Sequence, residues 1–171
     1  MAEQNNAAAS LPAGADPDNT LILQTTPGVI FIELDTDVAP KHAERLKQLA
    51  REGFYDDVPF HRVIEGFMAQ TGDGQHGNGT GGSSYPDLKS EFSDVAFERG
   101  TVGMARKGGN NHSANSQFFI MFDEGSFLNG QYTVIGEVIA GMDVVDKLKR
   151  GEPPANPDRI IRMQVAADAG S

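Results

Sequence analysis

One arginine stands in a mostly apolar stretch of the sequence, FHRVIEGFM at residues 60–68. A guanidinium keeps its charge at physiological pH, so placing Arg62 among apolar side chains costs free energy unless its five N–H donors find acceptors. A donor of fixed charge can stabilise a polar group without gaining or losing a proton. The pattern therefore predicts that Arg62 is a functional hydrogen-bond donor.

Two glutamines are spaced so that they can accompany this arginine. On a strand, alternation places Met68 and Gln70 on one face, and it does the same for Gln117 and Phe119. For the aromatic pair at residues 118–119, spacing alone favours ordinary core packing. Taken by themselves, these residues indicate an apolar pocket with one arginine and two glutamines.

The glycine-rich run at residues 72–82 matches the pattern GxGxxG at Gly72 and again at Gly77. A dinucleotide-binding fingerprint must open a helix whose N-terminus faces the pyrophosphate, whereas the next residues, SSYPD, are typical of a turn. No Lys followed by Ser or Thr completes a phosphate-binding loop either. We therefore interpret the run as a tight surface loop with positive φ angles.

The four histidines give little support to acid–base or metal chemistry. His42 falls in a predicted helix, and His76 and His112 fall in loops rich in glycine and asparagine. On a strand His61 should face away from Arg62, which favours a structural role. The histidine spacing matches no metal motif, and no nucleophile elbow or carboxylate pair is evident. We therefore expect no metal site.

Length and composition favour a single acidic domain. The chain has 171 residues with 14 basic and 24 acidic side chains, a net charge of -10 that argues against nucleic acid as a partner. It has no cysteine, which fits a reducing compartment. Neither a signal-like start nor a membrane-length apolar run is present, so we expect a cytoplasmic protein. No coiled-coil or exposed apolar seam is evident, which favours a monomer.

Apolar spacing predicts two helices. Pro40 suits a first helical turn, residues 43, 46, 49 and 50 form an apolar stripe, and Gly53 can end the helix. A second helix is predicted at residues 142–149. The expected strands are residues 21–24, 29–34, 59–64, 66–71, 101–105, 116–122, 132–139 and 159–166. Without βαβ alternation, these elements predict a mainly β fold: a closed, mostly antiparallel sheet with helices at its ends.

Several motifs in order resemble the cyclophilin family of peptidyl-prolyl cis-trans isomerases. They are FHRVI-x-GFM-x-Q-x-GD at 60–73, NGTGG at 78–82, MA at 104–105, SQFFI at 116–120 and FLNG at 127–130. The resemblance covers residues 20–167, which we predict to be the isomerase domain. Residues 1–19 are expected to form a disordered or loosely attached tail, and residues 168–171 a C-terminal tail. The resemblance implies a closed eight-stranded antiparallel β-barrel capped by two α-helices.

The same resemblance implies an activity and a set of site residues. The enzyme would accelerate rotation about X-Pro bonds in proline-containing peptides and in unfolded or folding proteins, without a cofactor. Arg62 would be the catalytic donor to the proline nitrogen, with Gln70 beside it. The implied substrate-binding residues are Phe67, Met68, Ala105, Arg106, Gln117, Phe119, Phe127, Leu128 and Tyr132.

The chain also departs from familiar members of the family. Phe127 stands where cyclosporin-sensitive members have tryptophan, so we expect weak or no cyclosporin binding. Tyr132 stands where many members have histidine, a change that the resemblance associates with bacterial forms. Arg106 replaces a familiar asparagine, but a main-chain contact with substrate tolerates this change. The polar loop at 107–115 is about two residues longer than in familiar eukaryotic proteins.

A second function remains open from the sequence. A proline-peptide binding or chaperone module would use the same pocket, with turnover incidental. Arg62 is the feature that separates the two hypotheses, because a binding site has no need of a desolvated arginine. The sequence therefore favours the isomerase.

Overall fold

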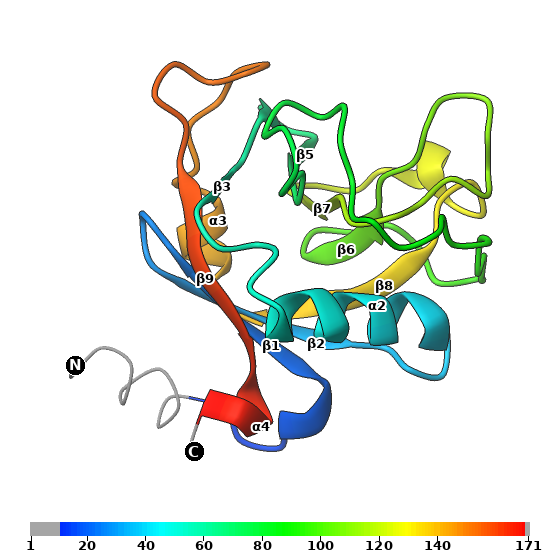
Figure 1. Ribbon diagram of the computed structural model, residues 1–171, viewed down its shortest axis with the longest axis horizontal. Coiled ribbons are helices and arrows are strands. Elements are labelled where there is room, and N and C mark those ends of the chain that lie inside the picture. The colour runs from blue at the N-terminus through cyan, green and yellow to red at the C-terminus, as the bar shows by residue number, and fades with distance from the viewer. Residues whose placement is uncertain (1–10, 170–171) are drawn as a thin grey trace.

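A computed structural model describes residues 11–169, in which nine strands form one antiparallel sheet (Figure 1). The strands are β1 Thr20–Thr25, β2 Val29–Leu34, β3 Val58–Pro59, β4 Arg62–Ile64, β5 Met68–Thr71, β6 Thr101–Met104, β7 Phe118–Met121, β8 Val134–Ala140 and β9 Arg159–Val165. Their order across the sheet is β3-β9-β1-β2-β8-β6-β7-β5-β4. The prediction of a mainly β, antiparallel fold is confirmed.

The predicted strand at residues 59–64 is in fact two strands, which lie at opposite edges of the sheet. β3 pairs with β9 through Val58 and Ile160, whereas β4 pairs with β5 through Val63 and Ala69. Only residues 60 and 61 separate β3 from β4, so the sheet is strongly curled. The hydrogen-bonded ladder does not continue from β3 to β4. The predicted closed eight-stranded barrel is therefore wrong in detail: the described residues form a nine-stranded half-barrel.

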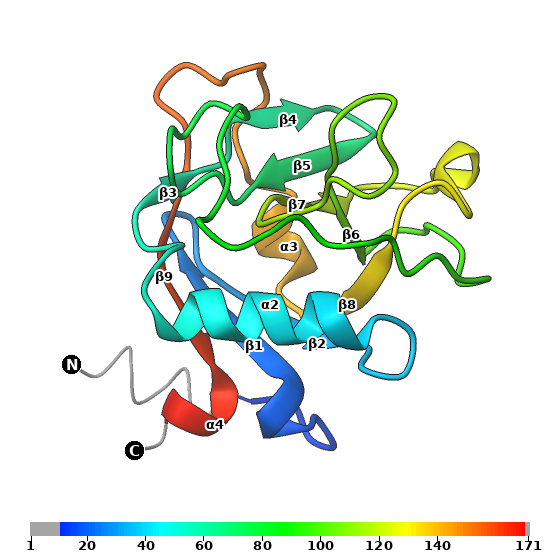
Figure 2. The ribbon, with the colours of Figure 1, turned by 45° about the vertical axis from the view of Figure 1, so that its right-hand side comes forward.

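The longer predicted helix is confirmed, and the second is shorter than expected. α2 spans Pro40–Arg51, begins with proline, and lies beside the curled sheet (Figure 2), where Leu46 and Leu49 pack into the main core. α3 spans only Met142–Val145. After it the chain continues to Leu148 in turns held by i→i+3 hydrogen bonds, which an apolar stripe cannot distinguish from helix. No helix within residues 11–169 is long and apolar enough to cross a membrane.

Three short helical segments were not predicted: η1 Pro17–Asn19, η2 Ser126–Leu128 and α4 Ala166–Ala169. The described part of the predicted N-terminal tail contacts the sheet. Leu11 packs against the cluster around Phe31, and the main-chain N–H of Asp16 donates to Glu33 Oε2 at 3.1 Å. Residues 1–10 and 170–171 lie outside the described residues. The predicted domain boundaries stay predictions.

Candidate active site

Most of the predicted site residues line one cleft of about 300 Å³. It is formed where β4, β5 and β7 lie side by side and three loops meet their ends. The predicted residues that line it are Arg62, Phe67, Met68, Gln70, Ala105, Arg106, Phe119, Leu128 and Tyr132. The cleft thus brings Arg62, Gln70 and an apolar wall together, whereas the second predicted glutamine, Gln117, does not line it.

The apolar wall belongs to a small core of its own. Met68 and Phe119 are buried there together with Leu128. Phe97 stacks on Phe119 with ring centroids 5.8 Å apart, and Tyr132 meets the same ring edge-on at 5.8 Å. Aromatic contacts in these geometries hold the rings in place. The wall is therefore an apolar surface whose side chains are held by their packing.

The core-packing interpretation is right for Phe118 and incomplete for Phe119. Phe118 points into the main core, where its ring packs against that of Tyr55 with centroids 5.7 Å apart. Phe119 points to the other face of β7 and lines the cleft. Period-two alternation of a strand accounts for this division.

Arg62 is not desolvated, contrary to the sequence-based expectation. Its side chain is 44% exposed, because β4 is an edge strand on which Val63 points inward and Arg62 outward. Its Nε donates to Glu152 Oε1 at 3.1 Å, and its Nη1 donates to Gln70 Oε1 at 3.4 Å. Within the described residues, Nη2 has no hydrogen-bond partner. The argument from desolvation therefore fails, and the case for Arg62 as a donor rests on this geometry.

A chain of amides connects Arg62 to the glycine-rich loop. Gln117 Nε2 donates to the carbonyl oxygens of Gly79 and Gly81, each at 2.9 Å. Carbonyl oxygens only accept, so this contact fixes which way the Gln117 amide faces. Its Oε1 then accepts from Gln70 Nε2 at 3.0 Å, which turns Gln70 Oε1 towards Arg62. Gln117 lines an adjoining hollow of about 380 Å³ rather than the cleft itself.

Asp73 organises the glycine-rich loop, a role that sequence reasoning missed. Its side chain is 1% exposed and accepts five main-chain N–H bonds of 2.8–3.2 Å. The donors are Gln75, His76, Asn78, Gly79 and Gly81. Burial alone would raise the pKa of Asp73, but these hydrogen bonds outweigh it and lower the pKa to about 2.

This loop has the tight form that was expected of it. Gly77 and Gly79 have φ angles of 70° and 99°, and a Cβ at Gly81 would collide with the Asp73 carboxylate. The main-chain N–H groups that a phosphate would need as donors already donate to the Asp73 carboxylate. The loop therefore supports the cleft, which Asn78, Gly79 and Thr80 also line although they were not predicted.

His61 lines the cleft beside Arg62 and does not face away from it as expected. It lies between β3 and β4 and belongs to neither strand, so strand alternation does not apply to it. Its ring is buried, and its Nδ1 has no hydrogen-bond partner in the part of the chain that the structure describes. Burial and the charge of Arg62 lower the pKa of His61, although the carboxylate of Asp73 opposes them. The ring is therefore held neutral near pH 7.

Phe127 lies outside the cleft, and Arg106 uses its side chain structurally. Phe127 is 68% exposed and packs against Phe67 with ring centroids 5.5 Å apart. The Arg106 guanidinium donates to the carbonyl of Gln131 and lies 4.3 Å from the centre of the Tyr132 ring. The main-chain N–H and C=O of Arg106 have no hydrogen-bond partner among residues 11–169. They remain available to an extended chain beside the cleft.

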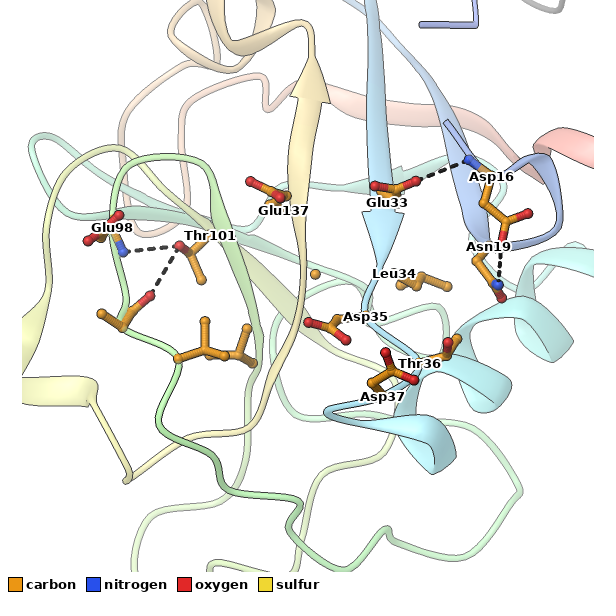
Figure 3. A pocket seen from close by; sticks show the side chains of 14 residues that line it. Asp16, Asn19, Glu33, Leu34, Asp35, Thr36, Asp37, Glu98, Thr101 and Glu137 are labelled. Atoms are coloured by element: carbon orange, nitrogen blue, oxygen red, sulfur yellow. Dashed lines mark hydrogen bonds between the residues drawn. The ribbon is translucent and has the colours of Figure 1, made fainter. Parts of the chain in front are cut away.

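A second hollow, of about 400 Å³, is strongly acidic (Figure 3). Its six carboxylates are Asp16, Glu33, Asp35, Asp37, Glu98 and Glu137. Glu33 and Glu137 face each other directly across β2 and β8. No group of three or more histidine or acidic side chains in the described chain has a metal-binding arrangement. This hollow has neither an arginine nor an aromatic wall, and we assign no chemistry to it.

Comparison with protein families gives one match over nearly the whole described chain. Residues 20–165 match the model described as "Cyclophilin type peptidyl-prolyl cis-trans isomerase/CLD". A probable peptidyl-prolyl cis-trans isomerase of Brucella suis is 56% identical over 171 residues, which covers 91% of this chain and 87% of the relative. The isomerase cypE of Dictyostelium discoideum is 39% identical over 154 residues, which covers 85% of this chain and 96% of the relative.

Solved structures give the same result. The cyclophilin AquaCyp293 from Hirschia baltica superposes with a TM-score of 0.83 at 30% identity, covering 90% of this chain and 76% of that one. A Cryptosporidium parvum cyclophilin-type isomerase, crystallised in the presence of the dipeptide Ala-Pro, superposes with a TM-score of 0.79 at 26% identity. That match covers 85% of this chain and 98% of the other.

Proposed function

This chain belongs to the cyclophilin-type peptidyl-prolyl cis-trans isomerases, and we propose that it catalyses X-Pro rotation by a hydrogen bond from Arg62 to the proline nitrogen. An X-Pro bond turns slowly because amide resonance imposes a barrier of ~18–20 kcal/mol. In the twisted transition state that resonance is lost, and the nitrogen becomes pyramidal and more basic. A donor to this nitrogen binds the transition state more tightly than the ground state, which is the condition for catalysis.

The observation that carries this proposal is the anchoring of the Arg62 guanidinium at the cleft. Glu152 and Gln70 hold Nε and Nη1, and Nη2 keeps its donors for a ligand. A preorganised donor needs little reorganisation when charge develops on the substrate. The proposed reaction requires neither a covalent bond nor a proton transfer. The neutral glutamine amides and the charged Arg62 are therefore sufficient for catalysis.

The apolar wall supports a role in holding the proline ring. Phe67, Met68, Phe119 and Leu128 would enclose the ring while the preceding carbonyl rotates. The main-chain groups of Arg106 would pair with the extended peptide, and its continuation would reach the hollow that Gln117 lines. The relative crystallised with Ala-Pro supports a dipeptide of this kind as the minimal ligand. We further propose weak or no cyclosporin binding, because Phe127 has no indole N–H to donate.

The pH dependence of activity is expected to be nearly flat. The mechanism uses no group that gains or loses a proton, and burial lowers the pKa of His61, which keeps its ring neutral near pH 7. We expect kcat/KM to vary less than about two-fold between pH 6 and 9. Exchange NMR on an Ala-Pro peptide at constant ionic strength would measure this without a coupling protease. A bell-shaped profile centred near neutrality would instead reveal an acid or base in the mechanism.

We also propose that the enzyme assists protein folding, and a refolding assay separates this role from a chaperone that only binds. The substrate is a protein whose slow refolding phase is limited by X-Pro isomerisation. Substoichiometric wild-type enzyme should accelerate that phase in proportion to its concentration and leave the fast phases unchanged. The Arg62→Ala variant should lose most of the acceleration. Equal effects of both proteins on refolding yield, without a change in rate, would favour the binding module.

A further inference from the structure

The register of the fold places Glu152 directly opposite Arg62. Val63 and Gly151 form an antiparallel bridge in which each main-chain N–H donates to the carbonyl of the other at 2.8 Å. In an antiparallel pair, the residue before Val63 faces the residue after Gly151. Arg62 and Glu152 are those residues. Main-chain pairing therefore places the two residues opposite each other, within reach of the contact between Arg62 Nε and Glu152 Oε1.

The same row continues across the sheet on the other side of Arg62. Arg62 is paired with Gln70 on β5, and Gln70 is paired with Phe119 on β7. One row across the sheet therefore contains, in order, Glu152, Arg62, Gln70 and Phe119. Cross-strand neighbours of this kind contact one another on a shared face. The arginine is held between an acidic acceptor and an amide acceptor.

The backbone at Glu152 is tightly constrained. Gly151 has a φ of 144°, and a Cβ added there would lie 2.5 Å from the Cα of Pro154. Only glycine can adopt this backbone conformation without a clash. The path of the main chain into Glu152 is therefore defined relative to β4.

We propose that Glu152 is a positioning residue that orients the Arg62 guanidinium for catalysis, an inference that rests on the proposed function. Its Oε1 accepts from Nε at 3.1 Å while Gln70 accepts from Nη1 at 3.4 Å. The guanidinium is planar, so holding Nε and Nη1 in place also fixes the direction in which Nη2 donates. Glu152 thereby keeps the Nη2 donors directed to one place in the cleft. It does not itself touch the substrate.

A second ion pair between the same two segments provides a matched control. Arg150 Nε donates to Glu65 Oε1 at 2.9 Å, so residues 62–65 and 150–152 are joined by two ion pairs. Glu65 is 78% exposed and does not line the cleft. Removing Glu65 weakens the attachment between the segments but leaves the contact of Arg62 with Glu152. Exposed ion pairs contribute little to stability, so neither loss should unfold the protein.

The experiment compares Glu152→Ala, Glu152→Gln and Glu65→Ala by exchange NMR on an Ala-Pro peptide, with thermal unfolding measured for each. We expect Glu152→Ala to lower kcat about 10-fold and to change KM less than about two-fold, because orientation is needed in the transition state. Glu152→Gln keeps an oxygen acceptor and should stay within about three-fold of wild type. Glu65→Ala should match wild type. If Glu152→Ala proves unstable, Glu152→Lys, which repels Arg62, should show at least the same loss.

A double variant separates this inference from the proposed function. In the Arg62→Ala background, Glu152→Ala should cause no further loss, because the group that it orients is gone. An unchanged kcat for Glu152→Ala, an equal loss for Glu65→Ala, or a full further loss in the double variant would each overturn the positioning role. Wild-type activity of Arg62→Ala alone would instead refute the proposed mechanism.

Discussion

Replacing Arg62 by alanine is expected to lower kcat/KM about 100-fold or more, because a charged hydrogen bond made in the transition state is worth a few kcal/mol. The side chain is 44% exposed, and its ion pair with Glu152 is a surface pair that adds little to stability. The variant should therefore fold normally. Its loss of activity would reflect the missing donor and not a damaged protein.

The measurement is kcat/KM on an X-Pro peptide panel in a protease-coupled assay, with Arg99→Ala as the control. Arg99 is 49% exposed and forms a comparable surface ion pair with Asp146. It does not line the cleft. The control should keep wild-type activity across the panel. Near wild-type turnover by a folded Arg62→Ala protein would refute the proposed mechanism.

Replacing Asp73 by alanine is expected to reduce the free energy of unfolding by roughly 3 kcal/mol and to reduce activity as well. The change leaves five main-chain N–H groups without their acceptor in the glycine-rich loop. The carbonyls of Gly79 and Gly81 would then no longer hold Gln117 in place. Urea unfolding at pH 7 measures the loss, and Asp37→Ala, an exposed carboxylate, should change stability little.

The stabilisation by Asp73 should also depend on pH. Its pKa is about 2 in the folded protein against an ordinary value of 3.8, so the folded state favours the ionised carboxylate. This contribution of about 2 kcal/mol is present above pH 4 and is lost as the pH falls towards 2. The difference in stability between wild type and Asp73→Ala should therefore shrink over that interval. A difference that stays constant down to pH 2 would contradict the assignment.

The sequence predicted the elements well where a pattern is local. Alternation and helical spacing located the strands and α2 because each depends on neighbouring residues. The strand at 59–64 was predicted as continuous, since nothing local shows that its first half pairs with the distant β9 while its second half pairs with the neighbouring β5. The length of α3 was overestimated for a similar reason, because a turn held by i→i+3 bonds keeps nearly the same apolar spacing.

The site was predictable as a set of residues but not as a network. The motifs identified most residues of the cleft but not His61, Asn78, Gly79 or Thr80. Spacing alone favoured core packing for both Phe118 and Phe119, although Phe119 lines the cleft. The exposure of Arg62 was missed because its strand is at an edge of the sheet, which the sequence does not show. Glu152 lies 90 positions from Arg62, and only the bridge between Val63 and Gly151 brings the two together. Asp73 had one local signal, a lone carboxylate at the head of a glycine-rich run.

The most direct test of the central claim measures binding and on-enzyme isomerisation separately. NMR titration and exchange spectroscopy of an Ala-Pro peptide give the Kd and the interconversion rate of the bound peptide for wild type and Arg62→Ala. If Arg62 acts in the transition state, the Kd should change less than about three-fold while the bound rate falls about 100-fold. An unchanged bound rate with a weakened Kd would show that Arg62 only binds substrate, and would contradict the account.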